Sequence, residues 1–250
     1  MNKPAQKSLT EKWDKKAQHY NRYTTDKNVL EVAICQKIVD AGIQLEGKRI
    51  LDIGCGTGAY TLRVAHKASH IDAVDISPEM LRILRADAKS HHLNNITTYI
   101  SSWEAYTLPH APYDIAIATM FPALKKAQHF QKMHDAADTK LFLGWGGKRG
   151  TELIEALFET HGGTYQPPNS ATTLKTWLES EQHPYQVIEH TEEKIRIKPW
   201  EEAIENYSWH LKARGMPPQR AKITQVLEQY RNAEGEVLER TMNYLNLVIW

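Results

Sequence analysis

Short apolar runs recur along the first 150 residues and alternate with stretches of helical periodicity. They predict five strands, at residues 48–53, 71–75, 96–100, 113–118 and 140–145. The runs 115–118 and 141–145 are apolar at every position, which is typical of strands covered on both faces of a parallel sheet. Strands that alternate with helices at this spacing predict crossover connections and a mainly parallel sheet.

Helical periodicity and capping residues predict helices before the first strand and after each of the first two strands. Two helices precede the first strand, one from Thr10 to about Tyr20 and one from Asn28 to about Gly42. A further helix starts at Ser77, with that serine as its cap and Pro78 at its first position, where a proline costs no hydrogen bond. The two leading helices predict an N-terminal helical arm.

The pattern loosens after residue 150. It predicts a helix at 151–158, a strand at 185–197, helices at 199–212 and 221–232, and a last strand at 237–250. With the five earlier strands this gives a seven-stranded sheet with helices on both faces. Because two helices fall between the two late strands, we expect a helical cap inserted before the last strand.

The charge balance excludes two classes of protein. The chain has 31 Lys and Arg against 30 Asp and Glu, a formal net charge of +1. This balance argues against nucleic-acid binding through bulk charge and against a disordered acidic chain. The sequence also has no aromatic-basic ladder of the kind that binds RNA. A nucleic-acid partner is therefore disfavoured, although it stays open.

Cysteine usage and hydropathy bear on the compartment. Cys35 and Cys55 are the two cysteines, too few for a disulfide framework, which favours a reducing, cytoplasmic location. The first residues contain no apolar segment of signal-peptide length, and no run approaches the about 18 apolar residues that a membrane span needs. We therefore expect no membrane partner, and a monomer or a homodimer.

The glycine-rich segment Gly54–Gly58 joins the first strand to a helix and is the most informative part of the sequence. Its glycines let a ligand approach the main chain closely, and Gly54, Gly56 and Ala59 also fit the dinucleotide-binding fingerprint. Two acidic residues help to decide between a dinucleotide and another ligand. Asp52, before the first glycine, suits a ligand with an ammonium group, and Asp75, at the end of the second strand, can accept from both hydroxyls of a ribose. Together they favour S-adenosylmethionine, an adenosine joined to an amino acid without phosphate.

Three segments of the sequence resemble the class I S-adenosylmethionine-dependent methyltransferases. They are Leu51–Gly58, Val74–Leu81, and Leu108-Pro109 followed by Tyr113–Ala118, and they occur in the family's order over about residues 45–150. The resemblance implies a Rossmann-like α/β fold and S-adenosylmethionine as cofactor, with S-adenosylhomocysteine as product. It also implies one methyltransferase domain over 1–250, with the arm at 1–45, the cofactor-binding core at 46–150, and the completing strands and substrate cap at 151–250.

The resemblance also implies roles for individual residues. Asp52, Gly54 and Gly56 would border the methionine part of the cofactor, Asp75 would bind the ribose, and Thr119 would lie near the transferred methyl group. The full set expected to bind cofactor is Asp52, Gly54, Cys55, Gly56, Gly58, Asp75, Ile76, Met80, Ser102, Trp103 and Thr119. Two registers are open for the adenine amine, because either Ser102-Trp103 or Glu104 can occupy the position where many relatives place an acid.

The sequence identifies no general base. In-line transfer from a sulfonium depends mainly on alignment, which contributes about 7–11 kcal/mol. The candidates for a catalytic role are Tyr20 in the arm and the pair Tyr207 and His210 in the cap. The sequence has no metal-binding motif, so we expect no metal. We expect a small-molecule substrate; the alternatives are a non-catalytic S-adenosylmethionine-binding regulator and a nicotinamide-dependent oxidoreductase.

Overall fold

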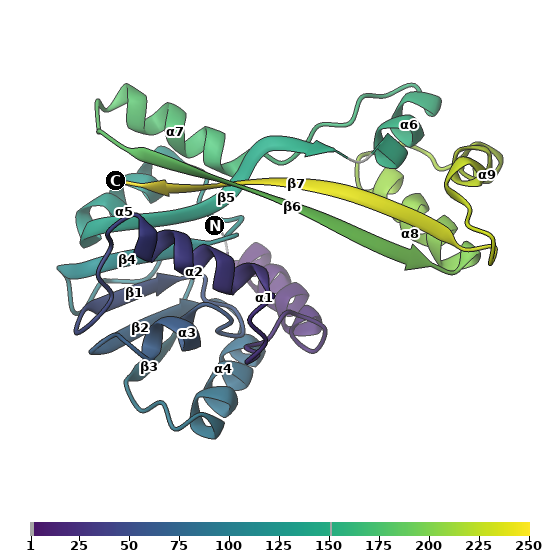
Figure 1. Ribbon diagram of the computed structural model, residues 1–250. Coiled ribbons are helices and arrows are strands. Elements are labelled where there is room, and N and C mark those ends of the chain that lie inside the picture. The colour runs from purple at the N-terminus through teal and green to yellow at the C-terminus, as the bar shows by residue number, and fades with distance from the viewer. Residues whose placement is uncertain (1–2, 151) are drawn as a thin grey trace. The chain divides into compact units, whose positions relative to one another are not determined.

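Seven strands form one sheet in the part of the protein that the computed structural model describes, residues 3–150 and 152–250 (Figure 1). Their order is β3-β2-β1-β4-β5-β7-β6. The strands are β1 Arg49–Ile53, β2 His70–Asp75, β3 Ile96–Ile100, β4 Tyr113–Thr119, β5 Ala137–Gly150, β6 Gln186–Lys198 and β7 Val237–Ile249. All seven lie where the apolar pattern predicts strands, although β5 is longer than expected.

The sheet is parallel from β3 to β5 and antiparallel where β7 joins it. Each neighbouring pair among β3, β2, β1, β4 and β5 is parallel, for example Ile50 beside Ile71 and Ile115. Lys140 and Trp250 exchange two backbone hydrogen bonds of 2.9 and 3.1 Å, the pattern of an antiparallel pair. The prediction of a mainly parallel, Rossmann-like sheet is thus confirmed.

Helices lie on both faces of the sheet (Figure 1). They are α1 Lys3–Ala17, α2 Leu30–Asp40, α3 Thr61–Ala65, α4 Pro78–Ser90, α5 Ala127–Ala136, α6 Glu152–Thr160, α7 Ser170–Ser180, α8 Trp200–Lys212 and α9 Arg220–Leu227, followed by the short 3₁₀ helix η1 Glu228–Tyr230. Ser77 caps α4 as predicted, since its hydroxyl accepts from the Met80 N–H at 3.1 Å. Thr10 lies inside α1 instead of starting it, and α5 and α7 were not predicted.

The chain forms two compact units. The first contains the described residues up to Gly144, together with Ser170–Glu189 and Asn246–Trp250, and the second contains Trp145–Asn169 and His190–Leu245. The predicted division into arm, core and cap stays a prediction, and the boundaries of the compact units differ from it. Among the helices of the described residues, none is both long and apolar enough to cross a membrane.

Each unit has its own apolar core. In the first unit, buried side chains of β1, β4 and β5 such as Leu51, Ala116 and Phe142 pack with Phe130 of α5 and Trp177 of α7. In the second unit, buried side chains of α6, α8 and α9 pack with one another. The strand order changes direction at β1, because β2 and β4 lie on its opposite sides. Ligands of open α/β sheets bind at the carboxyl ends of the strands beside such a point.

Candidate functional site

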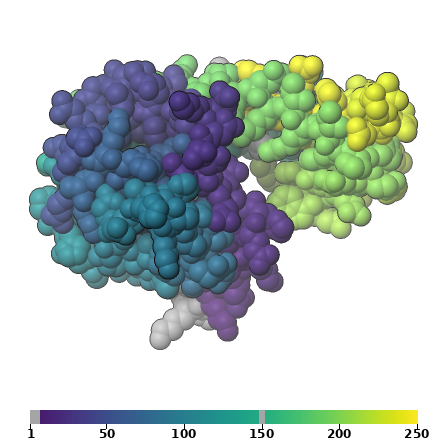
Figure 2. All heavy atoms as spheres, turned by 60° about the horizontal axis from the view of Figure 1, so that its bottom comes forward, coloured from purple at the N-terminus to yellow at the C-terminus, as the bar shows by residue number. Residues whose placement is uncertain are grey.

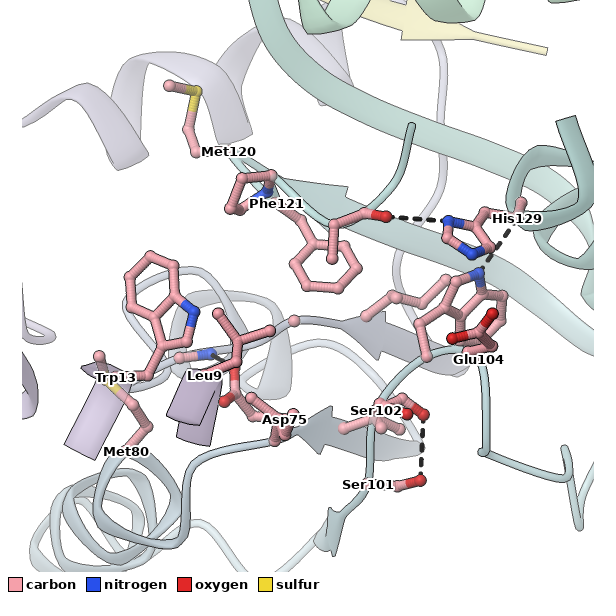
Figure 3. Close-up of a pocket in the computed structure, with 18 of the residues that line it drawn as sticks. Leu9, Trp13, Asp75, Met80, Ser101, Ser102, Glu104, Met120, Phe121 and His129 are labelled. Atoms are coloured by element: carbon pink, nitrogen blue, oxygen red, sulfur yellow. Dashed lines mark hydrogen bonds between the residues drawn. The ribbon is translucent and has the colours of Figure 1, made fainter. Parts of the chain in front are cut away.

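A pocket of about 370 Å³ opens at the carboxyl ends of β1, β2, β3 and β4, within the first unit (Figure 3). Its wall includes, among others, Gly54, Gly56, Asp75, Ile76, Met80, Ser102, Trp103, Glu104, Thr119, Phe121 and His129. Its volume is within the range of about 300–1,000 Å³ that ligand sites occupy. Eight of the eleven residues predicted to bind cofactor therefore lie together in this wall.

The backbone N–H groups of the glycine loop donate hydrogen bonds to acceptors within the protein. The N–H groups of Gly54 and Cys55 donate to the Val74 carbonyl at 2.8 and 3.1 Å, and the Gly58 N–H donates to the Cys55 carbonyl at 3.0 Å. The Gly56 N–H donates to the Asp75 carboxylate at 3.0 Å. With these four donors engaged, the loop has few left for the oxygens of a pyrophosphate.

Gly54 and Gly56 are glycines for different reasons. Both have left-handed backbone angles, with φ of 71° and 56°. A Cβ on Gly54 would lie 2.3 Å from a ring carbon of Phe121, whereas a Cβ on Gly56 would lie 3.5 Å from the nearest atom of Tyr20. The face of Gly54 is therefore covered by the Phe121 ring, and Gly56 keeps its face open to the pocket.

The Asp75 carboxylate connects the glycine loop to the start of α4. One oxygen accepts from the Gly56 N–H at 3.0 Å, and the other accepts from the Ser77 N–H at 2.9 Å. Burial raises the pKa of Asp75, and the N–H groups of Ser77 and Gly56 oppose that shift by stabilising the charged form. Each carboxylate oxygen can accept more than one hydrogen bond. Asp75 can therefore hold the loop and still accept from ligand hydroxyls.

Asp52 is not among the residues that line the pocket, and its predicted role beside the methionine part of the cofactor stays a prediction. It is 3% exposed, and one carboxylate oxygen accepts from the Thr61 hydroxyl at 2.6 Å. The other oxygen is buried without a hydrogen-bond partner in the described structure. Burial raises the pKa of Asp52 to about 7, although the Thr61 hydroxyl opposes the shift. The residue lies within β1, before the turn, so its side chain points into the protein.

Cys55 and Gly58 also lie outside the pocket wall. The Cys55 thiol is buried, and burial raises its pKa well above its usual range, so the thiol stays protonated. Gly58 has a φ of 85°, and a Cβ there would lie 2.5 Å from Leu62 and 2.7 Å from Leu84. Gly58 is therefore required by the packing of α3 and α4, and the predicted cofactor contacts of Cys55 and Gly58 stay predictions.

The segment after β3 lies next to Asp75. The Ser101 N–H donates to the Asp75 carbonyl at 2.9 Å, so the following residues continue along the pocket from that acid. Ser102, Trp103 and Glu104 all line the pocket. Both predicted registers for the adenine amine therefore remain compatible with the structure.

The arm supplies one side of the pocket. Leu9, Lys12, Trp13 and Tyr20 line it, and the Trp13 and Tyr20 rings meet edge to face at 6.0 Å. Trp13 and Ala17 pack on Met80 and Ile83 of α4. Figure 2 shows the purple N-terminal segment against the blue residues that follow it in the chain.

Tyr20 is the predicted catalytic candidate that lies at the pocket. Burial raises its pKa, and the nearby charges of Asp75 and Glu31 add to the shift. Its phenol therefore stays protonated at neutral pH and can donate a hydrogen bond. The protonated phenol cannot act as a general base.

The other two catalytic candidates lie in the second unit. Tyr207 is fully buried in that unit's core, and His210 lies beside it with ring centroids 6.2 Å apart. Tyr207 is thus a core residue of the second unit. Within residues 3–150 and 152–250, no group of three or more His, Cys, Asp or Glu side chains is arranged to hold a metal ion.

Sequence reasoning missed two parts of the pocket. Leu9 and Trp13 are spaced by four, which places them on one face of α1, and this spacing was available as a signal. His129, in contrast, belongs to α5, a helix that was not predicted. Its contribution depends on a fold contact, and the linear sequence carries no signal for it.

Comparison with known proteins gives the same family as the sequence motifs. The profile of a family described as a methyltransferase domain matches residues 50–139. Aklanonic acid methyltransferase DauC from Streptomyces sp. (strain C5) is 27% identical over 116 residues, which are 45% of this chain and 51% of that protein. A release factor glutamine methyltransferase from Coxiella burnetii is 32% identical over 111 residues, which are 44% of this chain and 40% of that protein.

A solved structure supports the fold over nearly the whole chain. The precorrin-6y C5,15-methyltransferase from Geobacter metallireducens has a TM-score of 0.51 at 12% identity and covers 93% of each chain. This likeness concerns the fold alone. The chain spans about half of the first curated relative's length and 40% of the second's, and their names give different acceptors. The acceptor of this protein therefore does not follow from its relatives.

A first prediction tests the packing role of Gly58. Gly58→Ala should lower the free energy of unfolding by about 2–5 kcal/mol, because it adds strain at positive φ to a clash with two buried leucines. Gly42→Ala is the matched control, since Gly42 has a φ of 83° and nothing within 4 Å of its added Cβ. Gly42→Ala should lower the free energy of unfolding only by the cost of the backbone strain at positive φ. Urea unfolding measures both, and equal losses would contradict the packing role.

A second prediction concerns the buried Asp52 carboxyl. Its pKa is raised to about 7 in the folded protein, so the folded state binds more protons than the unfolded state below that pH. The contribution of Asp52 to stability is therefore lost as pH rises toward and through 7. Relative to Asp52→Asn, the wild type should lose about 1–4 kcal/mol of unfolding free energy between about pH 5 and pH 8. Urea unfolding at both pH values measures this. The prediction is wrong if the difference in unfolding free energy between the wild type and Asp52→Asn is the same at pH 5 and at pH 8.

Proposed function

We propose that this chain, whose residues 50–139 match a methyltransferase-domain family, is a class I S-adenosylmethionine-dependent methyltransferase that transfers a methyl group to a small-molecule acceptor. S-adenosylmethionine is the cofactor of this family, and when bound it supplies a methyl group activated on a sulfonium. The observation that carries the proposal is the pairing of the Asp75 carboxylate with the Gly56 N–H in one pocket wall.

This pairing favours a nucleoside without a pyrophosphate. Four backbone donors of the glycine loop are already used within the protein, and one of them is held by a carboxylate. A pyrophosphate needs free N–H groups and is repelled by that negative charge. A ribose, by contrast, offers hydroxyl donors that a carboxylate accepts. The loop therefore supports the methyltransferase assignment over a nicotinamide-dependent oxidoreductase.

The chain's own residues would act mainly by positioning. Asp75 would accept from the ribose hydroxyls, and Ile76 and Met80 would provide apolar contacts for the adenine. Phe121 packs on Gly54 and borders the part of the pocket next to Thr119. Tyr20, with its phenol protonated, would donate a hydrogen bond without removing a proton. Alignment of this kind is enough for methyl transfer when the nucleophile does not have to lose a proton, because no general base is then needed.

The shape and charge of the site support a small acceptor. Trp13 of α1 and Phe121 of the loop after β4 face the pocket from different sides (Figure 3). A net charge of +1 gives the protein no general attraction for a nucleic-acid backbone.

The role of Asp75 predicts a loss of cofactor binding on substitution. Asp75→Ala should weaken S-adenosylhomocysteine binding by about 1.5–3 kcal/mol, because charge-assisted hydrogen bonds are lost. Asp75→Asn retains one acceptor and should fall between Ala and wild type. Asp114→Asn is the control: this acid binds the Arg49 N–H at the opposite ends of β1 and β4. Calorimetry should give the control wild-type affinity, and wild-type affinity for Asp75→Ala would contradict the assignment.

Methyl transfer itself is tested with S-adenosylmethionine labelled in its methyl group. The protein is incubated with the low-molecular-mass and macromolecular fractions of a cell extract, and binding of S-adenosylmethionine and NAD is measured in parallel. We expect label in the small-molecule fraction, and much less of it with Asp75→Ala at the same cofactor concentration. Label in protein or RNA would contradict the acceptor class, and binding of NAD alone would contradict the family's chemistry here. Cofactor binding without transfer to either fraction would favour the regulator.

A further inference from the structure

A long strand forms one edge of the sheet. β6 is the last strand in the sheet order, so β7 is its one neighbour in the part of the chain that the structure describes (Figure 1). It has 13 residues, whereas β3 at the opposite edge has 5. Natural sheets keep free edges short or cover them, because the unpaired N–H and C=O groups of an edge can pair with another strand. The length of β6 therefore makes this edge a candidate interaction surface.

Most of this edge is carried by the second unit alone. Residues 190–198 of β6 belong to that unit, together with residues 237–245 of β7. Side chains connect the two strands, since Arg240 donates to the Glu193 carboxylate at 3.3 Å and Asn243 donates to the Glu192 carboxylate at 3.4 Å. The free edge of β6 is thus supported from its other side by β7.

Two exposed isoleucines add apolar surface to this edge. Ile195 is 51% exposed and Ile197 is 54% exposed. They are two residues apart, so both side chains point to the same face of the strand. A single exposed apolar side chain is ordinary on a protein surface, but a strand added beside β6 would cover part of both.

The charges of β6 are divided between its two halves. Acidic residues come first and basic residues last: Glu189, Glu192 and Glu193, then Lys194, Arg196 and Lys198. Charges protect an edge strand when like charges meet. A second copy in the antiparallel direction would instead set the acidic half against the basic half, whereas a parallel copy would set like against like. The strand is therefore complementary to itself in the antiparallel direction.

Arg196 is the cation that such a pairing would serve. It is exposed and forms no ion pair with another described residue. The Lys194 ammonium, in contrast, lies 3.2 Å from a Glu192 carboxylate oxygen. Glu192, Lys194 and Arg196 share one face of the strand, because successive side chains alternate.

Twofold symmetry then selects a register. In a symmetric antiparallel pair, a residue on the axis meets its own copy. With Lys194 on the axis, Arg196 of each copy lies opposite Glu192 of the other. The two Lys194 side chains face each other, and each keeps its own Glu192 to offset the repulsion. A carboxylate has enough acceptor sites for both cations.

We propose that β6 is a homodimer interface, in which residues 190–198 pair in the antiparallel direction with the same residues of a second copy about an axis at Lys194. Backbone hydrogen bonds would extend the sheet from one copy to the other, and two Arg196–Glu192 ion pairs would fix the register. Ile195 would lie diagonally across from its own copy, within reach of a side-chain contact. Because both copies use the same edge, the pair closes without further growth.

The first test exchanges charges on the full-length protein. Sedimentation over the micromolar range should show a dimer for the wild type, and added salt should weaken it. Glu192→Arg and Arg196→Glu should each weaken self-association about tenfold, because each sets like charges opposite one another at two places. An equal mixture of the two variants should form a heterodimer with nearly the wild-type affinity, since opposite charges then meet again at both places.

The matched control is Arg220→Glu, in α9 of the same unit. It changes the net charge by the same amount as Arg196→Glu, and Arg220 is an exposed residue whose partner is Glu201, 2.8 Å away. This variant should leave self-association unchanged. Thermal unfolding checks that each variant is folded.

The second test reads the register through a disulfide. Lys194→Cys should give a cross-linked dimer on oxidation, because residues that face each other in an antiparallel pair have Cα atoms about 4.5–5.5 Å apart, a separation that a disulfide can bridge. Thr191→Cys is the control on the same strand. Thr191 would lie opposite the partner's Ile197, about 20 Å from its own copy, and should give no cross-link beyond that of the wild type.

Several results would overturn the proposal. It is wrong if the wild type is a monomer over this range, because the edge then takes another occupant or none. It is also wrong if the mixture of charge variants associates no better than each variant alone, if Arg220→Glu weakens the dimer as much as Arg196→Glu, or if Thr191→Cys is cross-linked and Lys194→Cys is not. None of these measurements uses the cofactor, so failure here is distinct from failure of the proposed function.

Discussion

The pocket depends on one carboxylate that holds two pieces of backbone together. Asp75 ends β2, and its oxygens accept from the N–H of Gly56 and the N–H of Ser77. The first bond fixes the glycine loop after β1, and the second fixes the start of α4. These two hydrogen bonds together hold the glycine loop and the start of α4 at the spacing that defines the pocket. The structural role and the proposed binding role thus fall on the same two oxygens.

The parts of the fold set by local pattern could be predicted from the sequence. The seven strands follow apolar runs, and the start of α4 follows from Ser77 and Pro78, because strand burial and capping are properties of neighbouring residues. Helices α5 and α7 were missed because their apolar faces are defined by packing on a sheet whose shape the sequence does not show. The start of α1 was misplaced because Thr10, a good capping residue, can also lie inside a helix.

The same distinction applies to the site. Residues at strand ends and in the following loops, such as Gly54, Gly56, Asp75 and Thr119, were predicted and lie in the pocket wall. Asp52, Cys55 and Gly58 belong to the same motif but face inward, since a motif also contains the residues that shape a turn. At position 58 a glycine is required because a Cβ there would clash with Leu62 and Leu84. A shared motif therefore does not place each of its residues in the pocket wall.

The hydrogen bonds of Asp75 also bear on how it would recognise a ligand. Asp75 is satisfied by backbone donors before any ligand arrives, so a ribose would add to an existing set of hydrogen bonds. A ligand without these hydroxyls would leave no unpaired group at this carboxylate. Because the strongest discrimination comes from polar groups that the wrong ligand leaves unpaired, Asp75 would contribute more to affinity for a sugar than to specificity for it.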